Sequence, residues 1–200
     1  MASGSEIRRA LIVVDMQNDF ADADGSLFVP GGPSILRRVN FAIAQAIADG
    51  AIVVYTQDWH PAETPHFAKN GGIWPDHCIG GSWGAELHPG LFIRGAVVRK
   101  GSGGEDGYSG FTMRDPVTGE TASTGLAELL RAEEIGAVTI VGLATDYCVK
   151  ETALDGVRLG FAVTVRSDLI GAVNLQPGDD ERAIAAMREA GVTIAGAETA

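Results

Sequence analysis

Residues 10–20, ALIVVDMQNDF, set the pattern that decides the fold of this chain. The run begins with apolar, mostly β-branched residues, and the carboxylate of Asp15 follows them directly. A short and almost continuous apolar run is typical of a strand that is buried on both faces of a parallel sheet. Ligands of such sheets bind beyond the carboxyl ends of the strands, so Asp15 occupies a position where functional side chains are expected.

Runs of the same kind recur along the chain and alternate with segments of helical periodicity. Strands are predicted at residues 10–14, 51–56, 96–100, 137–143, 161–165 and 192–195. Helices are predicted at residues 33–49, 124–135, 145–159 and 177–190. This alternation predicts an α/β fold with a doubly wound, mostly parallel six-stranded sheet and helices on both faces, in three Rossmann-like layers.

Length and composition indicate a single domain. The chain has 200 residues, 46% of them hydrophobic, which suffices for one core. We expect one domain over residues 1–200, with residues 1–8 as a flexible N-terminal segment. No apolar run reaches the roughly 20 residues of a membrane helix, and the polar N-terminus lacks the apolar core of a signal peptide. We therefore expect a cytoplasmic protein.

The net charge and the cysteine content limit which binding partners and which cysteine roles are expected. The 15 basic and 26 acidic residues give a net charge of −11, which opposes binding to nucleic acid or to an anionic membrane. Cys78 and Cys148 are the two cysteines, and a reducing cytoplasm argues against a disulfide between them. Two thiols without a CxxC pattern exclude a structural zinc cluster. A small-molecule substrate is the expected partner, and the sequence leaves a homo-oligomer open.

Chemically useful side chains follow four of the predicted strands. Asp15 follows the first strand, Asp58 and His60 follow the second, and Lys100 ends the third. Cys148 comes after the strand at 137–143, just inside the helix that begins near residue 145. Because the carboxyl ends of parallel strands share one edge of the sheet, these side chains are expected to converge.

Three of these residues form a combination suited to nucleophilic catalysis. Backbone N–H groups at a helix N-terminus favour an anion, so they are expected to lower the thiol pKa of Cys148 and to hold a developing oxyanion. Lys100 beside the thiol would stabilise a thiolate. Asp15 could take the thiol proton and later deliver it to a leaving amine. Taken singly, each residue also has a plain explanation: a core cysteine, a solvated lysine and a turn-capping aspartate.

A second group of residues suits a metal ion. His60, His66 and His77 follow Asp58 closely, in QDWHPAETPHF and IWPDHC. One carboxylate with two or three imidazoles fits a divalent transition metal such as zinc, iron or manganese. Asp58 and His60 are two residues apart and would face the same side of an extended segment. Histidines scattered in polar loops are the alternative, and His88 is interpreted as structural.

Two long irregular regions, 58–95 and 101–123, carry most of the aromatic residues. Long ordered loops in compact domains are often binding loops. A flat ring substrate would need apolar walls, although core packing explains any single aromatic side chain. Candidates are Phe20, Trp59, Trp74, Trp83 and Tyr108. Phe20 and Trp74, close in sequence to Asp15 and His77, are the preferred ones.

Five motifs together resemble those of a known family. They are VVDMQNDF at 13–20, TQDWHP at 56–61, WPDHC at 74–78, VRKG at 98–101 followed by YSGF at 108–111, and GLATDYCV at 142–149. In this order, they resemble the nicotinamidase/pyrazinamidase group of the isochorismatase-like cysteine hydrolases. The DxH with a downstream WPxHC is the feature that indicates nicotinamidases within that superfamily.

The resemblance implies a role for particular residues. Asp15, Lys100 and Cys148 match the catalytic triad. The backbone N–H groups of Ala144 and Cys148 match the oxyanion hole, beside a cis peptide bond between Leu143 and Ala144. The matching metal ligands are Asp58, His60 and His77, with His66 as a further ligand found in some members. The matching positions around the substrate ring are Phe20, Trp74 and Tyr108.

The resemblance also implies an activity. Such enzymes hydrolyse nicotinamide, and pyrazinamide, to nicotinate and ammonia through a cysteine thioester, in the salvage of NAD. One divalent metal, zinc before iron or manganese, binds the pyridine nitrogen. Two alternatives remain open at this point: a related amidohydrolase acting on another small amide or ureido compound, and a non-catalytic metal- or nucleotide-binding α/β module.

Overall fold

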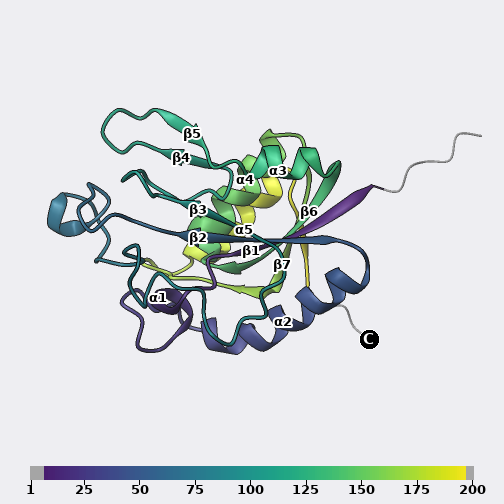
Figure 1. The fold of residues 1–200 in the computed structure, drawn as a ribbon, viewed down its shortest axis with the longest axis horizontal. Helices are drawn as coiled ribbons and strands as arrows, with labels where there is room; N and C mark the ends of the chain where they lie inside the picture. The colour runs from purple at the N-terminus through teal and green to yellow at the C-terminus, as the bar shows by residue number, and fades with distance from the viewer. Residues whose placement is uncertain (1–6, 197–200) are drawn as a thin grey trace, which may run out of the picture.

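The computed structural model describes residues 7–196, and a parallel sheet forms its centre (Figure 1). The sheet has six strands in the order β3-β2-β1-β6-β7-β8, and every pairing within it is parallel. The strands are β1 (Arg8–Val14), β2 (Ile52–Asp58), β3 (Ala96–Lys100), β6 (Ile135–Leu143), β7 (Ala162–Gly171) and β8 (Thr193–Ala195). The predicted α/β fold and its six strands are confirmed.

Helices cover both faces of the sheet. The longer ones are α2 (Gly32–Ala48), α3 (Leu126–Ala132), α4 (Lys150–Arg158) and α5 (Asp179–Glu189). The short ones are α1 (Asn18–Ala21), the 3-10 turn η1 (Ala68–Asn70) and the π-helical turn η2 (Thr145–Val149). In Figure 1, α2 lies below the sheet, and α3, α4 and α5 lie above it. Among the described residues, no helix combines the length and the apolar composition that crossing a bilayer requires.

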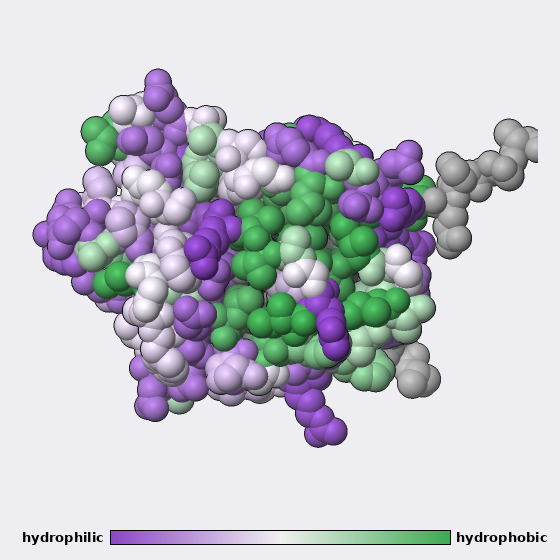
Figure 2. Space-filling view, in the orientation of Figure 1, coloured by the Kyte–Doolittle hydropathy of each residue, from purple (hydrophilic) through white to green (hydrophobic). Residues whose placement is uncertain are grey.

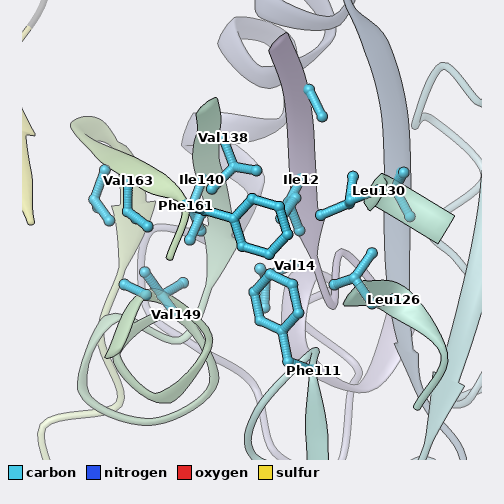
Figure 3. Close-up of a cluster of buried hydrophobic side chains, with 14 of the residues drawn as sticks. Ile12, Val14, Phe111, Leu126, Leu130, Val138, Ile140, Val149, Phe161 and Val163 are labelled. Atoms are coloured by element: carbon cyan, nitrogen blue, oxygen red, sulfur yellow. The ribbon is translucent and has the colours of Figure 1, made fainter. Parts of the chain in front are cut away.

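The apolar run of β1 is buried because both of its faces are covered. Side chains alternate along a strand, so successive residues enter different cores. Ile12 belongs to the core under α3, α4 and α5, where it lies near Phe111 and Leu126 (Figure 3). Leu11 belongs to the other core, which α2 covers with Ile43. Complete burial of an aliphatic side chain stabilises the fold by roughly 1.5–3 kcal/mol.

The structure differs from the sequence prediction at several points. The irregular region 101–123 contains an antiparallel hairpin of β4 (Thr112–Arg114) and β5 (Thr121–Ser123), which was not predicted. Their residues are intermediate or exposed, so they lack the apolar alternation by which strands are recognised. β7 continues past residue 165 into polar sequence. Of the expected flexible segment 1–8, residues 1–6 lie outside the described residues, and Arg8 already belongs to β1.

An open apolar groove lies beside the edge strand β3. Its lining includes Ile47 of α2, Val53 of β2, Phe92 and Leu129. In Figure 2 it coincides with the green area in the middle of the visible face. This groove follows the amino-terminal half of β2, away from the strand ends where polar side chains gather.

Gly142 in β6 allows the close approach of two strands, and its replacement tests this packing. It has a φ of 113°, and a Cβ added there would lie 2.1 Å from the carbonyl oxygen of Val14. Gly142→Ala therefore adds a steric clash to left-handed strain, which alone costs about 1–3 kcal/mol. We expect urea titration to show a loss of unfolding free energy clearly above that range.

Gly160→Ala is the matched control. Gly160 has a φ of 89°, but nothing lies within 4 Å of a Cβ placed there. This variant should show only the cost of left-handed strain. Equal losses for the two variants would show that the contact with Val14 does not constrain the sheet.

Candidate active site

The strand ends bring Asp15, Asp58, Lys100 and Cys148 together around one buried ammonium group. Lys100 Nζ lies 2.8 Å from Asp15 Oδ2 and 3.2 Å from Asp58 Oδ1. It also donates a hydrogen bond to Cys148 Sγ over 3.6 Å. Asp58 and Lys100 are direct partners in the register of β2 and β3, so the sheet itself sets this contact. The structure thus brings the three catalytic candidates, Asp15, Lys100 and Cys148, together as predicted.

Asp15 is held in a strained and well-defined conformation. Its φ is 47°, which is uncommon for a residue other than glycine. The hydroxyl of Thr56 donates to Asp15 Oδ1 at 2.7 Å and accepts the backbone N–H of Asp15 at 3.3 Å. Thr56 lies on the neighbouring strand β2, and the sequence analysis missed it. The available signal was its place at the start of the polar end of β2, two residues before Asp58.

Cys148 lies in η2, directly after β6, as the sequence predicted. The peptide bond between Leu143 and Ala144 is cis, as the resemblance implied. Asp146 in the same turn accepts hydrogen bonds from the backbone N–H groups of Val173 and Asn174, at 3.0 and 2.7 Å. The sequence analysis did not single out Asp146, which ties this turn to the segment after β7.

Electrostatics at the thiol differ from the expectation. Burial raises the pKa of Cys148 well above its usual value, and Lys100 only partly opposes this effect. The expected lowering of the thiol pKa is therefore wrong, because desolvation of the buried sulfur outweighs the nearby cation. With its pKa raised in this way, the thiol keeps its proton at neutral pH.

The carboxylates on either side of Lys100 are in unequal environments. Burial raises the pKa of Asp15, and the opposing effects of Lys100 and Thr56 are smaller. Burial also acts on Asp58, but His60 and Lys100 outweigh it and hold the pKa well below its usual range. Burial disfavours the charged form of Lys100, yet Asp15 and Asp58 raise its pKa well above normal. Lys100 is therefore a permanent cation, and Asp15 is the more easily protonated carboxylate.

The predicted histidines form a second cluster against Asp58. One ring nitrogen each of His60, His66 and His77 lies within 4.8 Å of the others, and all three residues are buried. Asp58 Oδ2 is 3.1 Å from His60 Nε2 and 3.4 Å from His77 Nε2. All four candidate ligands are thus brought together, including His66. His88 lies apart, with Nε2 3.7 Å from Asp22.

The hydrogen bonds around these rings fit a divalent metal ion. Metal-binding histidines usually donate the N–H of the other ring nitrogen to a protein acceptor. His77 Nδ1 meets the carbonyl of Pro75 at 2.8 Å, and His66 Nδ1 meets Asp106 at 2.6 Å. In both rings this arrangement leaves Nε2 without a proton and able to coordinate. Three imidazoles and one carboxylate form a donor set typical of transition metals.

Gln17, which the sequence analysis also missed, fixes the position of Asp58. Its side-chain amide donates to the carbonyl of Asp58 at 2.7 Å and accepts the N–H of Asp58 at 2.7 Å. It is completely buried between β2 and the carbonyl of Ala85, which it also contacts. Asp58 is thus held along its backbone as well as through its carboxylate.

A single small pocket connects the thiol with the histidines. The pocket is narrow, with a cavity volume of about 30 Å³. It is lined by Cys148, Ala144, Asp58, His66, His77, Gly107, Phe20, Leu27, Val29, Trp74, Tyr108, Tyr147 and Val173. The three predicted ring positions all line it, whereas the sequence analysis missed Leu27, Val29, Tyr147 and Val173.

The aromatic walls of the pocket support one another. Trp74 Nε1 donates to the hydroxyl of Tyr108 at 2.8 Å, and the ring of Trp74 meets Tyr147 edge-on at 4.7 Å between centroids. Two other tryptophans lie elsewhere. Trp59 stacks against the guanidinium of Arg99 at 3.7 Å, and Trp83 is 52% exposed.

The chain is similar to known proteins over most of its length. Residues 9–199 match the model of the isochorismatase domain. A nicotinamidase of Escherichia coli (strain K12) is 41% identical over 204 residues, which cover 93% of this chain and 93% of that protein.

Solved structures of similar proteins share the fold. PnC1 from L. infantum, in complex with nicotinate, is 38% identical with a TM-score of 0.85 and covers 94% of this chain and 92% of its own. The pyrazinamidase of Pyrococcus horikoshii, in complex with zinc, is 37% identical with a TM-score of 0.83. The match covers 95% of this chain and 99% of that protein's chain. By its motifs, its sheet and these similarities, this chain belongs to the isochorismatase family.

Proposed function

We propose that this protein is a nicotinamidase, an amidohydrolase that converts nicotinamide, and also pyrazinamide, to nicotinate or pyrazinoate and ammonia. The observation that carries the proposal is the pocket that Cys148 lines together with His66 and His77 of the histidine cluster. A ring with an amide on one side and a nitrogen on the other can meet both groups at once. The relatives named nicotinamidase and pyrazinamidase support the same reaction.

The reaction begins with activation of the buried thiol. Because burial keeps Cys148 protonated, a base is required, and Asp15, which shares the ammonium of Lys100 with the thiol, is that base. As the proton moves to Asp15, the adjacent ammonium of Lys100 stabilises the thiolate that forms. The sulfur then attacks the carboxamide carbon and gives a tetrahedral oxyanion.

The backbone N–H groups of Ala144 and Cys148 hold this oxyanion in our proposal. Loss of one such donor typically lowers kcat by about a hundredfold to a thousandfold. Asp15 returns its proton to the amide nitrogen as the carbon–nitrogen bond breaks, so ammonia leaves and a thioester remains on Cys148. Water, deprotonated by Asp15, then hydrolyses the thioester, which releases nicotinate and restores the thiol.

The ligands of the metal in this proposal are Asp58, His60, His66 and His77. When bound, a divalent ion, preferably zinc, supplies a Lewis-acid site for the pyridine nitrogen and so orients the ring. Phe20, Trp74 and Tyr108 form the apolar walls against which the ring packs.

The proposed activity belongs to the salvage of NAD, where nicotinamide is returned to pyridine nucleotide biosynthesis. We place the enzyme in the cytoplasm, where thiols stay reduced. Both cysteines, Cys78 and Cys148, are free in the structure.

Replacement of the nucleophile tests the proposal directly. Cys148→Ala should lower ammonia release from nicotinamide by about 10⁴-fold or more, since the loss of a nucleophile abolishes the covalent route. Cys78→Ala is the control, because Cys78 is also buried but does not line the pocket. Its kcat should stay near that of the wild type. Activity of Cys148→Ala within a few-fold of wild type would refute the mechanism.

The pH profile tests the role of Asp15. Burial raises the pKa of Asp15, so the acid limb of kcat/KM should lie above the usual aspartate value of about 4. Activity falls as the pH drops through this limb, because protonated Asp15 cannot accept the thiol proton. The hydrogen bond from Thr56 favours the ionised form and lowers this pKa.

Thr56→Val removes that hydrogen bond at nearly constant volume, so it should move the acid limb to higher pH. Thr152→Val is the control, because Thr152 is as fully buried as Thr56 but contacts Gly110 rather than Asp15. An unchanged or downward-shifted acid limb in Thr56→Val would contradict the proposed role of Asp15.

Removal of the metal tests the role proposed for Asp58 and the three histidines. Dialysis against a strong chelator should lower kcat/KM for nicotinamide at least about tenfold, and added zinc should restore it. Benzamide, which lacks the ring nitrogen, serves as the control substrate and should respond much less. Full activity toward nicotinamide in protein shown to be metal-free would contradict the proposed role of the metal in orienting the ring.

A further inference from the structure

We propose that Asp106 is a positioning residue that orients His66 for metal binding, an inference that rests on the proposed function. Asp106 Oδ1 lies 2.6 Å from His66 Nδ1, and the side chains are only 19% and 4% exposed. Asp106 comes from the glycine-rich segment 101–107, which joins β3 to the pocket. Neither the motifs nor the histidine cluster includes this carboxylate.

The backbone of Asp106 is fixed by the hairpin of β4 and β5. Its N–H donates to the carbonyl of Arg114 at 2.7 Å, and it accepts the N–H of Arg114 at 3.2 Å. This reciprocal pair extends the hairpin by one bridge toward the site. The unpredicted hairpin thus anchors the carboxylate that reaches His66.

A second connection holds the same segment against the histidines. The hydroxyl of Thr64 donates to the carbonyl of Gly104 at 2.9 Å and accepts the N–H of His66 at 3.2 Å. The His66 backbone and the Asp106 loop are therefore tied together at a point separate from the imidazole–carboxylate contact. This second tie preserves the local backbone when the Asp106 side chain is altered.

The contact with Asp106 determines which nitrogen of His66 faces the cluster. A carboxylate accepts a hydrogen bond only from a protonated nitrogen, so Nδ1 carries the proton and Nε2 is left for coordination. The ring of His66 also stacks on His60, with centroids 4.6 Å apart and an interplanar angle of 20°. Stacking alone would allow the ring to turn over, whereas the carboxylate selects one orientation.

The test measures zinc affinity directly, by competition with a chromogenic chelator on the full-length protein stripped of metal. Removal of such a carboxylate partner typically weakens metal binding by about 10- to 100-fold. We expect Asp106→Ala to weaken zinc binding by this factor. Asp106→Asn should have a smaller effect, because its amide oxygen can still accept the hydrogen bond. Glu105→Gln is the matched control, since Glu105 contacts Gly103 instead of His66, and its affinity should match wild type.

A double mutant distinguishes positioning from a general structural effect. If Asp106 acts through His66, Asp106→Ala should cause no further loss of zinc affinity in a His66→Ala background. An equal loss in both backgrounds, or wild-type affinity in Asp106→Ala, would overturn the inference. If Asp106→Ala does not fold, Asp106→Leu, whose side chain has a similar size but cannot accept a hydrogen bond, gives the same comparison in the two backgrounds. Failure of the wild-type protein to bind zinc would instead remove the proposed metal site and this inference with it.

Discussion

The site depends on one buried cation, the ammonium of Lys100, held between the carboxylates of Asp15 and Asp58. An ammonium out of contact with water is costly unless it is paired and hydrogen-bonded. Here the sheet supplies both partners. Asp58 in β2 is the register neighbour of Lys100 in β3, and Asp15 directly follows β1, which pairs with the other edge of β2. The same ammonium contacts the Cys148 sulfur, so the pairing that makes the lysine tolerable also places it beside the nucleophile.

The sequence predicted all six strands of the parallel sheet, most clearly those that are buried on both faces. β1, β2 and β6 are nearly continuous apolar runs, and the polar residues after them were identified by the rule that ligands bind at strand ends. Thr56 and Gln17 were missed because their importance depends on what lies opposite them in space. The hairpin of β4 and β5 was missed because its stability comes from backbone pairing rather than from an apolar face. The predicted shift of the Cys148 pKa had the wrong direction, because it considered the nearby helix N-terminus and not the burial of the sulfur.

The catalytic candidates and the candidate metal ligands are held by different parts of the fold. Asp15, Asp58 and Lys100 stand at the ends of strands within the rigid sheet, and Cys148 follows directly on β6. His66 and His77 belong to the long connection between β2 and β3, and their orientation depends on acceptors such as Asp106 and the Pro75 carbonyl. Reactive groups thus rest on the most stable part of the fold, whereas the groups that distinguish substrates rest on loops, as in many enzymes.

The strand order has a consequence for biosynthesis. β1 is the first strand made, yet it occupies the middle of the sheet, where Ile12 pairs with Ile140 of β6. On the ribosome, the N-terminal half of the chain must therefore wait, with an apolar strand edge exposed, until the distant partner emerges. Such long-range pairing slows folding, because loop-closure entropy is lost before the contacts form, and it leaves an unpaired strand edge open to aggregation in the meantime. Asp15 and the turn that carries Cys148 follow β1 and β6, so the two residues can meet only after these strands have paired.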